Sequence, residues 1–389
     1  MTNGKTIIWA EHVCKLYGQN VKAAEEMMMR GADKEEVKRQ TGVTVALWDV
    51  SFEVNAGEIF VIIGLSGSGK STLIRCFNRL NEPTSGKVWL CEEEVGTLGK
   101  KELLDFRRNK MSMVFQNFGL MSHRNVLDNV AYGLEVRGVK KAEREARAKE
   151  MIALVGLSGC EKQPISSLSG GMKQRVGIAR ALVGGTEVLL MDEPFSALDP
   201  LVRKDMQSEL LAIQKKLDKT VIFITHDMDE AFFLGDRVAI MRDGKIIQID
   251  TPMNMAAHPA NDYVRDFINS ADKAKVFTAK QVMEPPGCVV TDSDKPADVL
   301  RFARERGADF TFITDADGRP VGVIGIEAVT GTGSLIKAEK AAAAAIAAEN
   351  DHLRDLLDRT AESRFPVAVV DGDGRLIGQI TKSIILSSI

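Results

Sequence analysis

The stretch GLSGSGKST, residues 64–72, has the residue types and spacing that bind nucleotide phosphates. It matches G-x-x-x-x-G-K-[ST], in which glycines let backbone N–H groups turn inward and Lys70 reaches the β- and γ-phosphates. Ser71 offers its hydroxyl to Mg²⁺, and Thr72 lies beside the α-phosphate. The apolar stretch EIFVII precedes the motif and a helical pattern follows it, which is the context this chemistry needs. The predicted phosphate-binding residues are Gly64, Ser66, Gly67, Ser68, Gly69, Lys70, Ser71 and Thr72.

A second apolar run, VLLMD, ends in the adjacent acids Asp192 and Glu193. At the carboxyl end of a parallel strand beside phosphates, Asp192 suits the shell of a Mg²⁺ ion. Glu193 is placed to accept a proton from an attacking water. The alternative is a pair of strand-end acids that only cap a helix, and the phosphate loop favours the catalytic interpretation.

A second glycine-bearing loop, LSGGMKQR at residues 168–175, also precedes a helical pattern. Ser169 occupies an N-cap position, and Gly170 and Gly171 permit close backbone approach, so this loop is a second anion site. One γ-phosphate is already enclosed by the first loop. Two interpretations therefore remain open: the loop is a simple capped helix, or it binds the nucleotide held by a second copy of the chain.

These residues need a scaffold of alternating strands and helices, and the first 250 residues show that pattern. EIFVIIG, EVLLMD and TVIFITHD are strands by length and β-branching, and STLIRCFNRL is a helix. We expect a largely parallel sheet covered on both faces. Residues at about 117–185 form a helical subdomain inserted between core strands. Residues 19–42 form a second charged helical insertion, with Gly31 as a C-cap and Asp33 and Glu36 at capping-box spacing.

A second region follows residue 270 and contains an internal repeat. DADGRPVG, residues 315–322, recurs as DGDGRLIG, residues 371–378, each copy lying between two apolar strands and after a helix-prone stretch. We expect two β-α-β-β units, 271–333 and 334–389, whose turns use Asp and Gly because these residues tolerate positive φ. The alanine-rich residues 340–350 are predicted to be a helix or a linker.

The bulk composition restricts the class of protein. The chain has 389 residues, which favours two or three domains, and its net charge of −3 gives no general attraction to nucleic acid or anionic lipid. No apolar run reaches the roughly 20 residues that span a bilayer, and the N-terminus lacks the apolar core of a signal peptide. Five scattered cysteines form no CxxC pair, which disfavours zinc sites and disulfides. We therefore expect a reduced, cytoplasmic protein.

Residues 6–267 resemble the nucleotide-binding domain of ABC (ATP-binding cassette) transporters. The family's motifs occur in order: the phosphate loop, VFQ with Gln116, LSGGM, VLLMDEP, SALDP with Asp199, and ITHD with His226. The resemblance implies an α/β P-loop ATPase, with a RecA-like core and an inserted helical subdomain, over residues 1–270. It also implies Mg²⁺ and ATP as cofactors and head-to-tail pairing of two copies.

By this resemblance, Glu193 and His226 are catalytic, and His226 holds the γ-phosphate and the attacking water. Gln116 joins Ser71 and Asp192 around Mg²⁺, senses the water and relays to a membrane partner.

The same resemblance implies a composite site between two copies. Ser169, Gly170 and Gly171 contact the nucleotide held by the other copy, and Asp199 connects the two sites. Tyr17, in KLYG, stands where the family stacks an aromatic ring on adenine.

More closely, the chain resembles the ATPase subunit of bacterial glycine betaine/proline (quaternary-amine) importers. The insertion at 19–42, SMVFQNFGLMSHRNVLDNVAYGLEVRG, DEPFSALDPLVRKDMQ and the C-terminal repeat carry this resemblance. The repeat is similar to an α+β pair of cystathionine-β-synthase (CBS) domains, which implies regulation by an adenine nucleotide or by ionic strength. The resemblance implies a peripheral motor subunit on the cytoplasmic face of the inner membrane. Its partners would be a second copy, transmembrane permease subunits and, indirectly, a periplasmic or extracellular substrate-binding protein.

The sequence leaves the transported osmoprotectant open among glycine betaine, proline betaine, proline, choline and carnitine, because selection lies in separate subunits. A rival class is a soluble, non-transport ABC ATPase acting on nucleic acid or ribosomes. Such proteins commonly fuse two cassettes or carry long coiled coils, neither of which the sequence shows, so no nucleic-acid partner is expected. A third reading, a CBS binding module with a vestigial cassette, is opposed by the intact Lys70, Asp192, Glu193 and His226.

Overall fold

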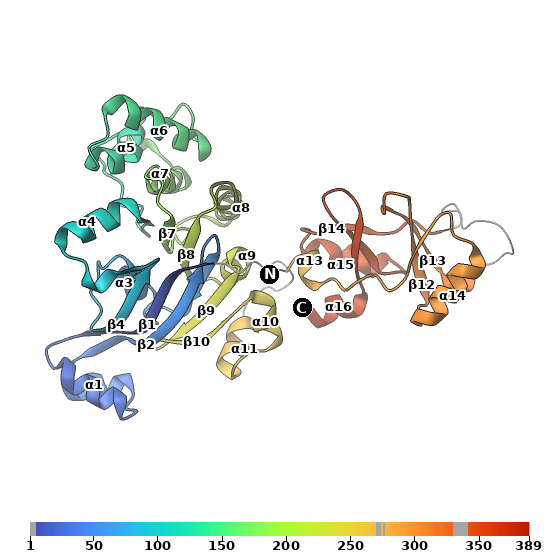
Figure 1. The fold of residues 1–389 in the computed structure, drawn as a ribbon, viewed down its shortest axis with the longest axis horizontal. Coiled ribbons are helices and arrows are strands. Elements are labelled where there is room, and N and C mark those ends of the chain that lie inside the picture. The colour runs from blue at the N-terminus through green and yellow to red at the C-terminus, as the bar shows by residue number, and fades with distance from the viewer. Residues whose placement is uncertain (1–4, 270–273, 275–276, 330–340, 389) are drawn as a thin grey trace. The chain divides into compact units, whose positions relative to one another are not determined.

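The computed structural model describes residues 5–269, 274, 277–329 and 341–388 of the chain. It consists of two compact units, Met1–Ile268 and Asn269–Ile389, called here the N-terminal and the C-terminal unit (Figure 1). In the described part of the chain, no helix is long and apolar enough to cross a membrane.

The centre of the N-terminal unit is a six-stranded sheet in the order β10-β9-β3-β8-β7-β6. Every residue of β3, β7 and β8 is buried, as expected for central strands of a parallel sheet that is covered on both faces. β10 pairs with β9 antiparallel, and the other pairs are parallel, so the predicted largely parallel sheet is confirmed. The strands are β3 (Ile59–Ile63), β6 (Met111–Val114), β7 (Val188–Asp192), β8 (Thr220–Thr225), β9 (Arg237–Arg242) and β10 (Lys245–Asp250).

A second, antiparallel sheet has the order β2-β1-β4-β5 and was not predicted from the sequence. Its strands are β1 (Thr6–Tyr17), β2 (Thr44–Asn55), β4 (Ser85–Leu90) and β5 (Glu93–Glu94). Helix α3 (Lys70–Phe77) shares one buried apolar core with strands of both sheets. Phe52 stacks on Phe60 with ring centres 5.1 Å apart and meets Phe77 edge-on, which joins the two sheets and α3.

Helices complete the N-terminal unit. α5, α6 and α7 pack together as the helical subdomain that was predicted at 117–185 (green in Figure 1). The insertion at 19–42 forms two helices, and Asp33 caps the second by accepting a hydrogen bond from Glu36 N at 2.8 Å. The first ends with Arg30 as its C-cap, and Gly31 follows it with a left-handed φ of +86°. The helices are α1 (Val21–Met29), α2 (Lys34–Thr41), α4 (Lys100–Asn109), α5 (Val126–Val136), α6 (Lys141–Leu154), α7 (Gly170–Leu182), α8 (Pro200–Leu217), α9 (Met228–Leu234), α10 (Pro252–Ala257) and α11 (Asp262–Asn269), with 3-10 turns at Val95–Thr97 and Ile165–Ser167.

The C-terminal unit contains two copies of a β-α-β-β motif, as the repeat predicted. In each, the first two strands are parallel and the last two form an antiparallel hairpin. The glycines of the hairpin turns, Gly318 and Gly374, have φ of +82° and +81°. The motifs comprise β11 (Val289–Thr291), α14 (Pro296–Arg306), β12 (Phe310–Thr314) and β13 (Pro320–Gly325), then β14 (Ile346–Ala348), α15 (Leu353–Glu362), β15 (Val367–Val370) and β16 (Leu376–Ile380). Also described in this unit are the helices α13 (Ala279–Val282) and α16 (Lys382–Ser388) and a 3-10 turn at Ile326–Ala328.

The prediction of a helix or linker for the alanine-rich stretch 340–350 was wrong in part. Lys340 lies outside the described residues, and Ile346–Ala348 is the strand β14. This strand pairs in parallel with β15, and Ala347 is fully buried. The ladder of hydrogen bonds and the burial outweigh the helix propensity of alanine, which is only a weak preference.

Candidate functional site

The phosphate loop begins where β3 ends and leads into α3. Gly67 and Gly69 take left-handed φ of +80° and +103°, which residues with a Cβ rarely adopt. A Cβ on Gly69 would lie 2.5 Å from the carbonyl oxygen of Ala46, and one on Gly64 would lie 2.2 Å from that of Met241. The loop is therefore pressed against backbone on both sides, and only glycine fits at these positions.

Lys70 lies buried within this loop. Its ammonium donates hydrogen bonds to the carbonyl oxygens of Gly64 at 2.7 Å and Leu65 at 3.1 Å, and burial lowers the pKa of Lys70. The hydroxyl of Ser68 is buried and has no hydrogen-bond partner among the described residues. A buried cation beside an unpaired donor fits an incoming phosphate, which would satisfy both groups.

The side chains expected near Mg²⁺ lie at the start of α3 and the end of β7. Ser71 Oγ donates to Asp192 Oδ1 at 2.8 Å, and Arg75 Nη2 is 3.2 Å from Asp192 Oδ2. No group of three or more His, Cys, Asp or Glu side chains capable of holding a metal occurs in the described ranges. Mg²⁺ commonly needs only one or two protein oxygens together with phosphate and water, so this hydroxyl–carboxylate pair fits it.

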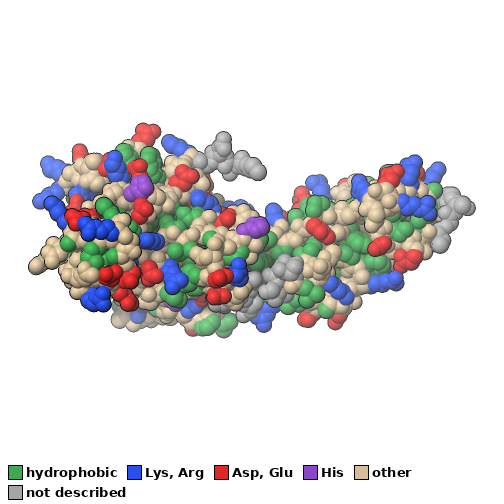
Figure 2. All heavy atoms as spheres, turned by 90° about the horizontal axis from the view of Figure 1, so that it is seen from below, with side chains coloured by type: hydrophobic (Ala, Val, Ile, Leu, Met, Phe, Trp, Pro, Cys, Tyr) green, Lys and Arg blue, Asp and Glu red, His purple; other side chains and the backbone are tan. Residues whose placement is uncertain are grey.

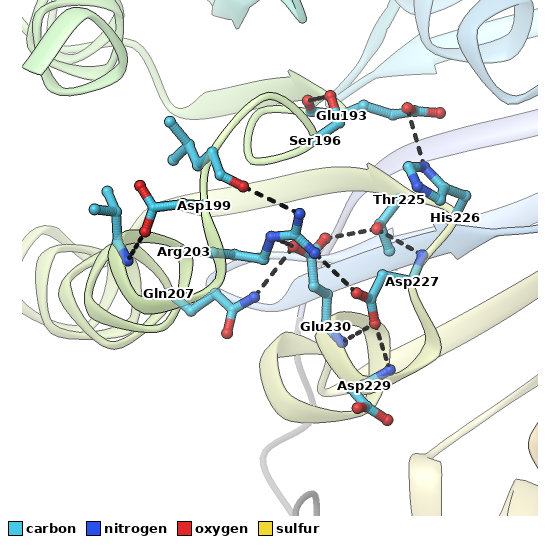
Figure 3. A network of polar contacts seen from close by, with 12 residues as sticks. Glu193, Ser196, Asp199, Arg203, Gln207, Thr225, His226, Asp227, Asp229 and Glu230 are labelled. Carbon is cyan, nitrogen blue, oxygen red and sulfur yellow. Dashed lines mark hydrogen bonds and ion pairs between the residues drawn. The ribbon is translucent and has the colours of Figure 1, made fainter. Parts of the chain in front are cut away.

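Polar side chains that follow the parallel strands β6, β7 and β8 meet around Glu193. Its Oε2 lies 3.3 Å from Nε2 of Gln116, which follows β6. The same oxygen lies 3.1 Å from Nδ1 of His226, which follows β8 (Figure 3). Its backbone has a left-handed φ of +46°, held by a hydrogen bond from Glu193 N to Ile224 O at 3.1 Å. The structure thus brings together the two residues predicted to be catalytic, with Gln116 beside them.

The second glycine-bearing loop lies against the start of α8. Ser169 caps α7 by accepting a hydrogen bond from Met172 N at 3.3 Å. A Cβ on Gly171 would lie only 2.7 Å from Cγ1 of Val202. In turn, Val202 N donates to Asp199 Oδ1, so Asp199 caps α8 next to this loop.

Gly170 lies against the loop before α8, because a Cβ added to it would lie 3.6 Å from a methyl group of Leu198. Ser169, Gly170, Gly171 and Asp199 therefore form one group, called here the α7–α8 edge. Among the described residues, no hydrogen bond or ion pair joins this edge to the phosphate loop at 64–72.

Tyr17 ends β1 and is 42% exposed, with Lys15 Nζ 4.9 Å from the centre of its ring. It pairs with Thr44 across the antiparallel sheet, two residues before Ala46, whose carbonyl backs Gly69. An exposed ring is thus presented near the phosphate loop, as a stacking platform for a base requires.

Sequence reasoning missed the polar residues that support this site. Arg75 was not predicted to bridge to Asp192, and a cluster of polar residues beside His226 was also missed (Figure 3). Within that cluster, the Glu230 carboxylate is buried, and burial raises its pKa, while the hydrogen bond from Thr225 lowers it. The sequence held one indication of this cluster: Asp227 directly precedes a helical stretch, which is typical of an N-cap.

Comparisons with known proteins agree with this geometry. The family described as ABC transporter matches residues 47–196, and the CBS domain family matches residues 344–389. The glycine betaine/carnitine transport ATP-binding protein GbuA of Listeria monocytogenes serotype 1/2a (strain 10403S) is 46% identical over 98% of this chain and 97% of that protein. The chain belongs to the ABC transporter ATP-binding subunits. The predicted family is thereby confirmed, as is the predicted fold of a P-loop ATPase followed by a CBS module.

Other ABC proteins show the same relationship. The glycine betaine transport protein OpuAA of Bacillus subtilis (strain 168) is 43% identical over 98% of this chain and 92% of its own. The dimeric structure of MJ0796, a bacterial ABC transporter cassette, superposes with a TM-score of 0.54 at 30% identity, covering 63% of this chain and 98% of that one. As an ABC transporter subunit, the chain binds ATP and couples its hydrolysis to transport.

Proposed function

We propose that this chain is the motor subunit of an importer for glycine betaine and related quaternary amines, bound peripherally at the cytoplasmic face of the cell membrane. The observation that carries the proposal is the extent of the similarity. Relatives named for glycine betaine transport match 98% of the chain, which includes the helical insertion and the C-terminal unit as well as the cassette. A relative from Pelagibacter ubique (strain HTCC1062), 48% identical over 72% of this chain and 82% of its own, is named for trimethylamine N-oxide transport.

In the proposed reaction, the phosphate loop holds ATP and Lys70 neutralises charge on its β- and γ-phosphates. Glu193 accepts a proton from the attacking water, and His226, 3.1 Å from Glu193, orients that water and the γ-phosphate. Mg²⁺, held through Ser71, Asp192 and Gln116, would neutralise charge that develops on the phosphates. Hydrolysis then depends on positioning more than on covalent chemistry.

A second copy completes each site in this proposal. The α7–α8 edge offers an N-cap serine, two glycines and Asp199, but it makes no hydrogen bond to its own phosphate loop among the described residues. Head-to-tail pairing would bring this edge onto the ATP of the other copy. ATP would then hold the closed dimer and hydrolysis would release it, which gives a two-state cycle for the membrane partners.

We assign a regulatory role to the two β-α-β-β motifs, which we treat as CBS domains at 271–333 and 334–389. They are built from the same elements and turns, and the second matches the CBS family. An adenine nucleotide or a change in ionic strength is the expected signal. The permease subunits are the expected membrane partners, and a separate binding protein would deliver the substrate.

Uptake by proteoliposomes tests the proposal. Liposomes would contain this chain, its membrane subunits and the binding protein, with internal ATP and labelled glycine betaine outside. ATP-dependent uptake that Glu193→Gln abolishes is the expected result, and competition by unlabelled choline, carnitine or proline ranks the alternatives. Substrate-stimulated ATP hydrolysis without betaine uptake would keep the transporter and reject this substrate class.

A role on nucleic acid or ribosomes has less support. On the face shown in Figure 2, basic and acidic side chains are interspersed, and the net charge is −3. A nucleic-acid surface is expected to gather Lys and Arg on one face.

A further inference from the structure

Arg203, on the first turn of α8, reaches from the loop of Asp199 to the segment that carries His226 (Figure 3). Its Nη2 donates to Leu198 O at 3.3 Å, and its backbone N donates to Asp199 O at 2.9 Å. Its Nη1 donates to Asp227 Oδ2 at 3.2 Å. One planar guanidinium thus bonds the residue before Asp199 and the residue after His226.

The segment around His226 is closed by further polar contacts. Asp227 N donates to Thr225 Oγ1 at 3.0 Å, and Asp227 Oδ1 caps α9 by accepting from Glu230 N at 3.2 Å. Thr225 Oγ1 donates in turn to Glu230 Oε2 at 2.6 Å, and Gln207 Nε2 donates to Glu230 Oε1 at 3.1 Å. The residues on both sides of His226 are therefore fixed, while the imidazole itself extends from them toward Glu193.

The charged side chains of this cluster are largely buried, which restricts how far they can separate. The side chain of Glu230 is 6% exposed and that of Arg203 is 27% exposed, with Arg203 Nε 3.7 Å from Glu230 Oε1. A buried charge that loses its partner is costly, so these groups are expected to move together and not to separate. A displacement of the Asp199 loop would then be passed to Asp227 and to the adjacent His226.

We propose that Arg203 is a positioning residue that couples the Asp199 loop to His226, so that contact with the second copy at Asp199 sets the imidazole against Glu193. This inference rests on the proposed function, in which Asp199 meets the second copy and His226 acts at the γ-phosphate. Arg203 itself touches neither ATP nor water in this scheme. It determines whether the catalytic pair is aligned when the dimer closes.

Steady-state and single-turnover ATP hydrolysis by the full chain tests this coupling. Arg203→Met keeps an unbranched apolar stem and removes the guanidinium with its charge and its side-chain hydrogen bonds. We expect kcat to fall on the order of tenfold to hundredfold with ATP affinity unchanged, since misplacement of a catalytic group by about 1 Å has effects of that size. Arg203→Lys should recover part of the rate, because an ammonium can still reach one carboxylate.

Arg237→Met is the matched control. Arg237 lies at the start of β9, away from His226, is 28% exposed and pairs with Glu58 at 3.3 Å. Its substitution therefore removes an ion pair of similar burial that does not contact the His226 segment. Its kcat should stay within about twofold of the parent, as expected for a residue outside the site.

A double-mutant cycle separates positioning from general destabilisation. If Arg203 acts through His226, adding Arg203→Met to His226→Ala should lower the single-turnover rate no further. The coupling would be overturned if Arg203→Met lowered the single-turnover rate of His226→Ala by the same factor as it lowers that of the parent. A parental kcat in Arg203→Met alone would also overturn it. Either result would leave the ATPase assignment intact. A parent chain that hydrolyses no ATP would refute the proposed function, and the coupling with it.

Discussion

Replacing Glu193 with glutamine should stop ATP hydrolysis and leave the fold intact. The carboxylate makes two polar contacts, with Gln116 Nε2 at 3.3 Å and with His226 Nδ1 at 3.1 Å. Glutamine keeps the side-chain length and one oxygen acceptor. The lost interaction is therefore worth no more than about 0.5–1.5 kcal/mol of folding stability, the net value of a typical hydrogen bond.

The expected loss of rate is much larger. A positioned general base contributes about 10²–10⁴-fold, and each tenfold corresponds to about 1.36 kcal/mol of activation free energy. Glu193→Gln should therefore raise the barrier to hydrolysis by about 2.7–5.4 kcal/mol. Because the effect on the barrier exceeds that on stability, the variant should bind ATP and remain trapped before the chemical step.

Three measurements on one preparation decide this prediction. Phosphate release at saturating Mg²⁺ and ATP gives kcat, thermal unfolding gives stability, and size-exclusion chromatography with ATP reports the dimer that should accumulate. Glu187→Gln is the matched control, because Glu187 is an exposed residue just before β7 whereas Glu193 directly follows it. If Glu193→Gln kept more than about a tenth of the parental rate with the control unaffected, Glu193 would not be the base.

Three further predictions concern binding, packing and charge. Lys70→Met should abolish tight ATP binding, measured with a fluorescent ATP analogue, because it removes the buried ammonium inside the phosphate loop; unchanged affinity would contradict this role. Phe195→Ala should lower the free energy of unfolding in urea by about 3–5 kcal/mol, since this fully buried ring packs 5.5 Å from that of Phe223. Asp49, 2.6 Å from His12 Nδ1, raises the pKa of His12, so the pair should stabilise the fold at pH below about 6.5 and lose this contribution as pH rises through the raised pKa. Asp49→Asn should bring the His12 pKa back down in an NMR titration, and an unmoved pKa would exclude the carboxylate as the cause.

The sequence alone was enough to locate the phosphate loop, the acids after β7 and the two C-terminal motifs. Each depends on local order: glycines between a strand and a helix, an apolar run ending in Asp192 and Glu193, or a repeated Asp-Gly turn. Such patterns act within a few residues of the chain, so the backbone follows them with little influence from distant segments. Motif order then led to the ABC family, which the comparisons confirmed.

Only the tertiary structure revealed the features that depend on contacts between residues far apart in the sequence. Strands β1 and β2 find each other across the insertion, and alanine-rich β14 becomes a strand only because it pairs with β15. The bond between Arg203 and Asp227 spans 24 residues, and neither residue's neighbours in sequence indicate the other. Pairing energy and burial between distant segments set these features, and they outweigh local propensity because it is worth only fractions of a kcal/mol per residue.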